Sequence, residues 1–97
     1  MKNQKVIAKM LYAVGHEERL SMLIFLENKG GKAIFTELQV KFKLSQSQVK
    51  RYTKKMIAAG LIDHESRKPY KITELGKLFL KTIEELNKNI TQLSTEI

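Results

Sequence analysis

The stretch TELQVKFKLSQSQVKRYTKKMIAAGLI, residues 36–62, decides the fold. Thr36 and Ser45 are residue types that cap helix N-termini, and apolar residues at helical spacing follow each of them. Gly60 supplies a stop signal after the second apolar run. The stretch therefore predicts two short helices joined by a tight turn, the first beginning at Thr36 and the second at Ser45.

The second of these helices has one apolar and one basic face. At about 100° per residue, Val49, Thr53 and Met56 fall on one side, with Tyr52 and Ile57 close to them. The opposite side has no acidic residue and carries Ser47, Lys50, Arg51, Lys54, Lys55 and Ala58. The apolar side predicts contact with a core, and the basic side predicts contact with an anion.

Outside this stretch, the apolar spacing and turn signals predict three more helices and a hairpin. Before it lie a helix with apolar residues between Val6 and Val14, a helix that starts at His16, and a possible minor strand in KAIF, residues 32–35. After it, LIDHE and YKIT read as strands joined by SRKP, and Thr73 caps a last helix. This order is typical of a winged helix-turn-helix.

We therefore expect a mainly α fold with a small β-hairpin, a winged helix-turn-helix with an N-terminal and a long C-terminal dimerisation helix. Residues 1–97 are expected to form one domain. Within it, the helix-turn-helix covers about 36–59, the wing about 61–73, and a C-terminal dimerisation helix about 74–96.

Composition narrows the possible partners. The net charge is +8, and residues 41–71 alone hold nine basic and two acidic side chains. Such a concentrated surplus indicates nucleic acid, a membrane surface or an acidic protein as partner. The chain has no cysteine, which excludes disulfides and thiolate metal sites. We find no signal peptide and no apolar run of about 20 residues, so we expect a cytoplasmic, nucleoid-associated protein without membrane contact.

Three motifs in register resemble the ArsR-like winged helix-turn-helix regulators. LYAVGHEERLSMLIFL, residues 11–26, resembles the opening of that family. Residues 36–62 resemble its helix-turn-helix, and YKITELGKLFL, residues 70–80, resembles the Y-x-L-T-x-x-G pattern that follows the wing. The resemblance implies a homodimeric transcriptional regulator of prokaryotic or archaeal type that binds double-stranded DNA.

The chain departs from the family pattern at four points. Lys43 stands where the turn usually has glycine, so we expect a lysine with positive φ there. Gln39 replaces a usual alanine, and Thr53 a usual leucine. The metal box of the family's sensors would fall near residues 38–42, where this chain has no thiol. Metal sensing of that type is therefore not carried over.

The expected DNA-binding residues lie on the second helix of the pair and on the wing. Gln48 suits adenine and Arg51 suits guanine, because each can make paired hydrogen bonds to a base edge. Lysines suit phosphates, which add affinity without sequence information. The full candidate set is Ser45, Gln46, Ser47, Gln48, Lys50, Arg51, Lys54, Lys55, Arg67 and Lys68.

The last helix carries an apolar seam with alternating steps of four and three residues, a heptad pattern. One small domain cannot cover its distal half, which favours a homodimer. The candidate interface combines this seam with the apolar face of the first helix: Val6, Ile7, Met10, Leu11, Val14, Phe79, Ile83, Leu86, Ile90, Leu93 and Ile97. Parallel and antiparallel pairing both remain open.

No residues suggest catalysis or a cofactor. No glycine-rich phosphate loop follows a strand, and the chain has no cysteine and one aspartate. His16 occupies a helix start, which favours a local capping role. His64 lies beside Asp63 and Glu65, yet a metal site normally gathers three or four ligands, which favours a solvated histidine. We expect a non-enzymatic protein without a metal or cofactor; a small-molecule effector is neither indicated nor excluded.

The leading hypothesis is a sequence-specific, homodimeric DNA-binding transcriptional regulator. A low-specificity chromatin-type DNA-binding protein is the first alternative, because 15 lysines against three arginines suit phosphate contact better than base reading. A winged-helix protein-interaction module is the second. It would tolerate neutralisation of the basic helix but not disruption of the seam.

Overall fold

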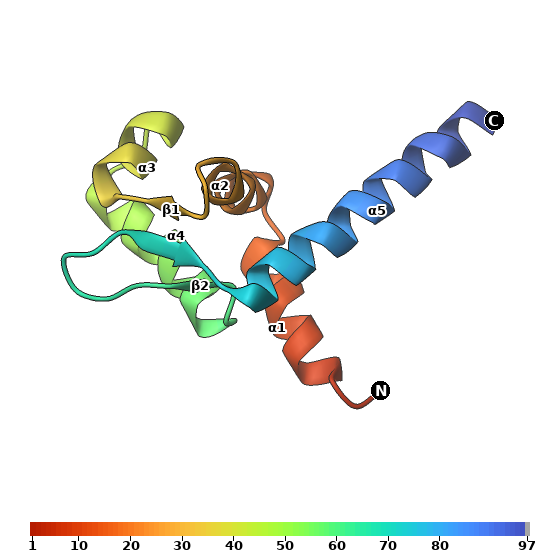
Figure 1. The fold of residues 1–97 in the computed structure, drawn as a ribbon, viewed down its shortest axis with the longest axis horizontal. Coiled ribbons are helices and arrows are strands. Elements are labelled where there is room, and N and C mark those ends of the chain that lie inside the picture. The colour runs from red at the N-terminus through yellow and green to blue at the C-terminus, as the bar shows by residue number, and fades with distance from the viewer. Residues whose placement is uncertain (97) are drawn as a thin grey trace.

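The computed structural model describes residues 1–96, which form five helices and one three-stranded sheet (Figure 1). In chain order these are α1 (Gln4–Val14), α2 (Glu17–Asn28), β1 (Lys32–Ala33), α3 (Phe35–Phe42), α4 (Gln46–Ala58), β2 (Ile62–Asp63), β3 (Tyr70–Ile72) and α5 (Glu74–Glu96). The order confirms the predicted winged helix-turn-helix. Helices α3 and α4 form the helix-turn-helix, and strands β2 and β3 form the wing.

The sheet is antiparallel in the order β1-β3-β2. Ala33 pairs with Tyr70 and Ile62 with Ile72, and these four side chains are buried on the inner face. The minor strand expected in residues 32–35 is confirmed over Lys32–Ala33, where it adds an edge to the wing.

One core joins all five helices and the sheet, with Met10, Ala13 and Val14 contributed by α1 and Phe79 by α5. Its fully buried side chains alternate with exposed ones at helical or strand spacing, as the sequence pattern requires. The largest of them are Met22, Leu23, Leu26, Leu38, Val49, Met56, Leu61 and Ile62. Helix α4 packs against α1, α3 and β2.

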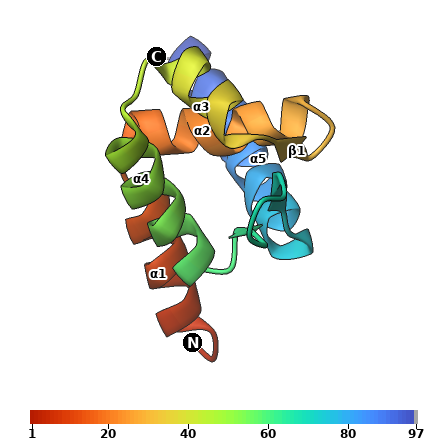
Figure 2. The same cartoon turned by 90° about the vertical axis from the view of Figure 1, so that its left-hand side faces the viewer.

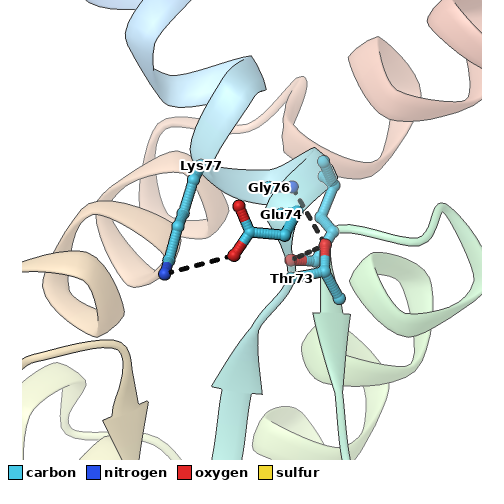
Figure 3. Close-up of polar contacts among 5 residues, drawn as sticks. Thr73, Glu74, Gly76 and Lys77 are labelled. Carbon is cyan, nitrogen blue, oxygen red and sulfur yellow. Dashed lines mark hydrogen bonds and ion pairs between the residues drawn. The ribbon is translucent and has the colours of Figure 1, made fainter.

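Three helix starts follow the predicted caps. The Ser45 Oγ atom accepts from the backbone N–H of Gln48 at 3.2 Å. Thr73 Oγ1 accepts from the backbone N–H of Gly76 at 2.9 Å (Figure 3). His16 Nδ1 accepts from the backbone N–H of Glu18 at 3.2 Å, which confirms the local capping role of this histidine. Each bond satisfies an N–H group that the helix itself leaves unpaired.

The predicted cap at Thr36 is wrong. Helix α3 begins at Phe35, and Ile34 is its N-cap. The carboxylate of Glu37 accepts the Ile34 N–H at 3.0 Å and forms an ion pair with Lys29 at 2.7 Å. The Lys29 ammonium and the Ile34 N–H lower the pKa of Glu37 below its ordinary value. An acidic side chain in the first turn therefore replaces the hydroxyl cap.

The wing joins α5 through a tight contact at Gly76. The Thr73 hydroxyl lies 2.6 Å from the Gly60 carbonyl oxygen and 3.1 Å from that of Leu61, so it ties the start of α5 to the segment after α4. A β-carbon at Gly76 would overlap the Leu61 carbonyl oxygen and lie 2.7 Å from Cγ1 of Ile72. The T-x-x-G motif is thus a cap followed by a close approach of backbones.

Helix α5 leaves the domain after its first turns (Figure 1). Phe79 is buried against the core and Ile83 is half-buried, whereas Leu86, Ile90 and Leu93 are 52%, 53% and 61% exposed. In the part of the chain that the structure describes, no helix combines the length and apolarity that a bilayer span requires. Polar residues lie between the exposed apolar residues of this seam, so the distal half of α5 is amphipathic.

Candidate nucleic-acid interface

The turn between α3 and α4 is made by Lys43 in the left-handed conformation, with φ 54° and ψ 49°. This confirms the expected positive φ at a position where glycine is usual. The Leu44 N–H donates to the Gln39 carbonyl oxygen at 3.0 Å, and Gln39 Nε2 donates to the Leu44 carbonyl oxygen at 3.4 Å. Gln39 therefore closes the turn with a side-chain bond that alanine could not make.

The inner face of α4 contains one polar residue, Thr53. Its side chain is buried, and its hydroxyl donates to the Val49 carbonyl oxygen at 2.8 Å. The bond satisfies the hydroxyl within the helix, so a threonine is tolerated where leucine is usual. Val49 and Met56 flank it and are fully buried. The apolar face expected from the helical wheel is confirmed at Val49, Thr53 and Met56, whereas Tyr52 is half-buried and Ile57 is exposed.

The outer face of α4 is exposed and has no acidic residue. Figure 2 shows α4 at one edge of the molecule, with α1 beside it. The exposed side chains include Gln46, Ser47, Lys50, Arg51 and Lys54. Because the inner face is locked into the core, these side chains project from a rigid element.

Gln48 is held by the helix cap. Its Oε1 atom accepts the backbone N–H of Ser45 at 2.8 Å, while its own N–H donates to Ser45 Oγ. The two bonds form a reciprocal capping box. Paired hydrogen bonds to adenine use both ends of a glutamine amide, so Gln48 must give up this bond before it can read an adenine.

Two tyrosines contact basic side chains of α4, and the sequence pattern does not reveal either contact. The Arg51 guanidinium lies 5.5 Å from the ring centre of Tyr52, and the Lys55 ammonium lies 5.2 Å from that of Tyr12 on α1. Both distances suit cation–π attraction. Lys55 is half-buried by this arrangement, unlike its exposed neighbour Lys54. Finding the Tyr12 contact requires knowledge that α1 packs on α4.

The wing tip is a tight turn with Arg67 at its positive-φ position, φ 64°. The Lys68 N–H donates to the Glu65 carbonyl oxygen at 3.0 Å, and the Lys68 ammonium pairs with the Glu65 carboxylate at 2.8 Å. Arg67 is exposed. The two predicted wing residues thus differ, because the charge of Lys68 is offset by the Glu65 carboxylate.

The candidate dimer-interface residues fall into three groups. Met10, Val14 and Phe79 are buried in the core of the protein's own chain, and Ile83 is half-buried. The others with described side chains are exposed: Val6, Ile7, Leu11, Leu86, Ile90 and Leu93. Ile97 lies outside the described residues. The two exposed apolar sets lie on α1 and on the distal half of α5.

His64 stacks on Tyr70, with ring centres 3.9 Å apart and planes inclined by 17°. Residues 1–96 contain no group of three or more histidine, aspartate or glutamate side chains placed to hold a metal ion. His64 is therefore an exposed histidine with an aromatic neighbour.

Comparison with known proteins agrees with this geometry. The profile described as winged helix-turn-helix matches residues 19–91, from α2 into α5. The chain belongs to the winged helix-turn-helix family. The match includes the α3–α4 pair, the wing and most of α5.

Two solved structures show the same winged helix-turn-helix fold. HlyU from Vibrio cholerae N16961 superposes with a TM-score of 0.70 at 22% identity, covering 88% of this chain and 95% of that one. A transcriptional regulator homologue from Pyrococcus horikoshii OT3 gives 0.65 at 24% identity, covering 93% and 98%. No curated protein sequence matches this winged helix-turn-helix protein.

Proposed function

We propose that this protein is an ArsR-like transcriptional regulator that binds duplex DNA sequence-specifically as a homodimer in the cytoplasm. One observation carries the proposal: the outer face of α4 is basic, exposed and free of acidic residues in a fold of the winged helix-turn-helix family. A polyanion is the partner that such a face attracts most strongly. The three sequence motifs that resemble the ArsR-like family support the finer assignment.

In this proposal the N-terminal part of α4 enters the major groove. Arg51 reads guanine, because its guanidinium is exposed and steadied by the Tyr52 ring. Gln46 and Ser47, both exposed at the start of α4, reach base edges or phosphates. Lys50 and Lys54 bind phosphates, and Arg67 extends from the wing towards the backbone or the minor groove.

The exposed apolar surface supports the homodimer. Leu86, Ile90 and Leu93 follow heptad spacing, and a groove of about 480 Å³ between α2 and α5 lies beside the start of the seam. Apolar side chains of Leu20, Ile24, Leu80 and Ile83 line this groove. A second copy would remove both surfaces from water and place two α4 helices on one duplex.

The deciding experiment is a selection from a random duplex library at near-physiological salt. We expect enrichment of an inverted repeat with half-sites about 34 Å apart, one helical turn. Retained DNA without an enriched sequence would contradict base reading and favour a chromatin-type protein. Failure to retain DNA would contradict DNA binding and favour a protein-interaction module.

A low-specificity chromatin-type role is the second candidate. Two observations favour it. Most of the basic residues are lysines, and the Gln48 side-chain amide that would read adenine already accepts the Ser45 N–H in the helix cap. Point variants separate the two roles. We expect Arg51→Ala to relax base preference, whereas Lys54→Ala weakens all sequences alike and lowers the salt slope by about one. Equal behaviour of the two variants would contradict the assigned roles.

A further inference from the structure

Helix α1 carries a second basic surface that adjoins the recognition helix α4. Residues 1–15 contain three lysines and no acidic residue. Lys5, Lys9 and Tyr12 recur at steps of four and three, so they form one line along α1, and Lys2 precedes it. All four side chains are exposed. We name Lys5 and Lys9 the α1 lysine line.

The line ends at the recognition helix. Helices α1 and α4 pack together, and Figure 2 shows them side by side. At the end of the line, the Tyr12 ring holds the ammonium group of Lys55 at 5.2 Å. The positive charge of α4 therefore continues onto α1 without an intervening acidic side chain.

The charges of the line are not offset within the protein. Among the described side chains, those of residues 1–95, the ion pairs are Lys29–Glu37, Lys68–Glu65 and Lys77–Glu74, and neither Lys5 nor Lys9 takes part in one. Along the helix axis the two lysines are about 6 Å apart. That separation is close to two rises of about 3.4 Å along the duplex axis, the axial distance from one phosphate to the next but one on the same strand.

The proposed dimer can leave the line accessible. At about 100° per residue, the line lies about 150° around α1 from the exposed apolar residues Ile7 and Leu11. Val6 lies nearer, about 80° from the line. A partner chain centred on Ile7 and Leu11 would therefore leave the line accessible, whereas one centred on Val6 would not.

We propose that the α1 lysine line binds phosphates of the duplex that flanks the site contacted by α4. This inference rests on the proposed DNA binding and extends its footprint. The line contributes affinity without base discrimination, because phosphate contacts carry no sequence information. Because these phosphates flank the base pairs that α4 contacts, the affinity also depends on how far the duplex extends beyond those base pairs.

The test compares two double variants that remove equal charge from exposed helix surfaces. Lys5→Gln/Lys9→Gln removes the line, and Lys81→Gln/Lys88→Gln removes two lysines of α5, which projects away from α4 (Figure 1). Affinity for the selected site is measured against salt on two duplexes. One ends at the site, and the other extends it by about ten base pairs, or one turn, on each side.

We expect the α1 variant to lower the salt slope by about two per protomer on the long duplex only, since each lost phosphate contact removes about 0.9. The α5 variant should keep the wild-type slope. Equal slopes for the two variants would overturn the proposal, and an equal loss on both duplexes would overturn the flanking position. Wild-type protein that binds neither duplex would instead contradict the proposed function.

Discussion

Gly76→Ala should destabilise the protein although glycine is a poor helix former. Within α5 the change would ordinarily add about 1 kcal/mol of stability. Here the new β-carbon overlaps the Leu61 carbonyl oxygen and lies 2.7 Å from Ile72 Cγ1. Both neighbours belong to the buried contact between the wing and α5, so α5 must move away. Overpacking of this kind costs about 3 kcal/mol, which leaves a net loss of about 2 kcal/mol.

Thermal unfolding followed by circular dichroism measures this loss. For a domain of this size, about 2 kcal/mol corresponds to a fall in Tm of roughly 10 °C. Lys77→Ala, one position further along α5, is the matched control, because Lys77 is exposed and its ion pair with Glu74 is long, at 3.6 Å. Its Tm should move by less than about 3 °C. A Gly76→Ala protein as stable as wild type would refute the close approach of the two backbones.

Three further changes test other parts of the structure. Lys43→Gly should raise the free energy of unfolding by about 0.5 kcal/mol in urea titrations, since glycine relieves the positive φ but loses more backbone entropy; a loss would contradict the relief of strain. Glu37→Gln should flatten the fall in stability as the pH drops below about 5. The lowered pKa of Glu37 means that its carboxylate stabilises the fold above the ordinary titration range and loses that effect on protonation; unchanged acid sensitivity would count against the Lys29 contact. Ile90→Glu should shift the protein from dimer to monomer in sedimentation velocity, whereas Gln92→Glu on the polar side should not; a wild-type monomer would remove the dimer proposal.

Local sequence signals were sufficient where one element contains both halves of an interaction. Ser45 and Thr73 each lie three residues before the residue whose backbone N–H donates to their hydroxyl oxygen, so residue type and spacing identify both caps. The turn at Lys43 followed from chain order in the same way. The helix order and most of the inner face of α4 could therefore be predicted from the sequence alone.

Contacts between elements could not be predicted in this way. Thr36 has the right residue type for a cap, but the Glu37 carboxylate, which pairs with Lys29 of the preceding segment, bonds the Ile34 N–H, and the N-cap of α3 lies two residues earlier. The site shows the same limit: Tyr12 holds Lys55 across two packed helices, and Glu65 offsets Lys68. Charge counts treat every lysine alike, whereas tertiary packing decides which ones remain free.

The junction at Thr73 joins α5 to the wing without a flexible linker. Helix α5 is 23 residues long, about 34 Å, and only Thr73 separates it from β3. The Thr73 hydroxyl bonds the Gly60 and Leu61 carbonyl oxygens, and Phe79 anchors the first turns of α5 in the core. We therefore expect the distal half of α5 and the wing to keep a fixed relative direction, so that a partner bound to one also limits where the other can lie.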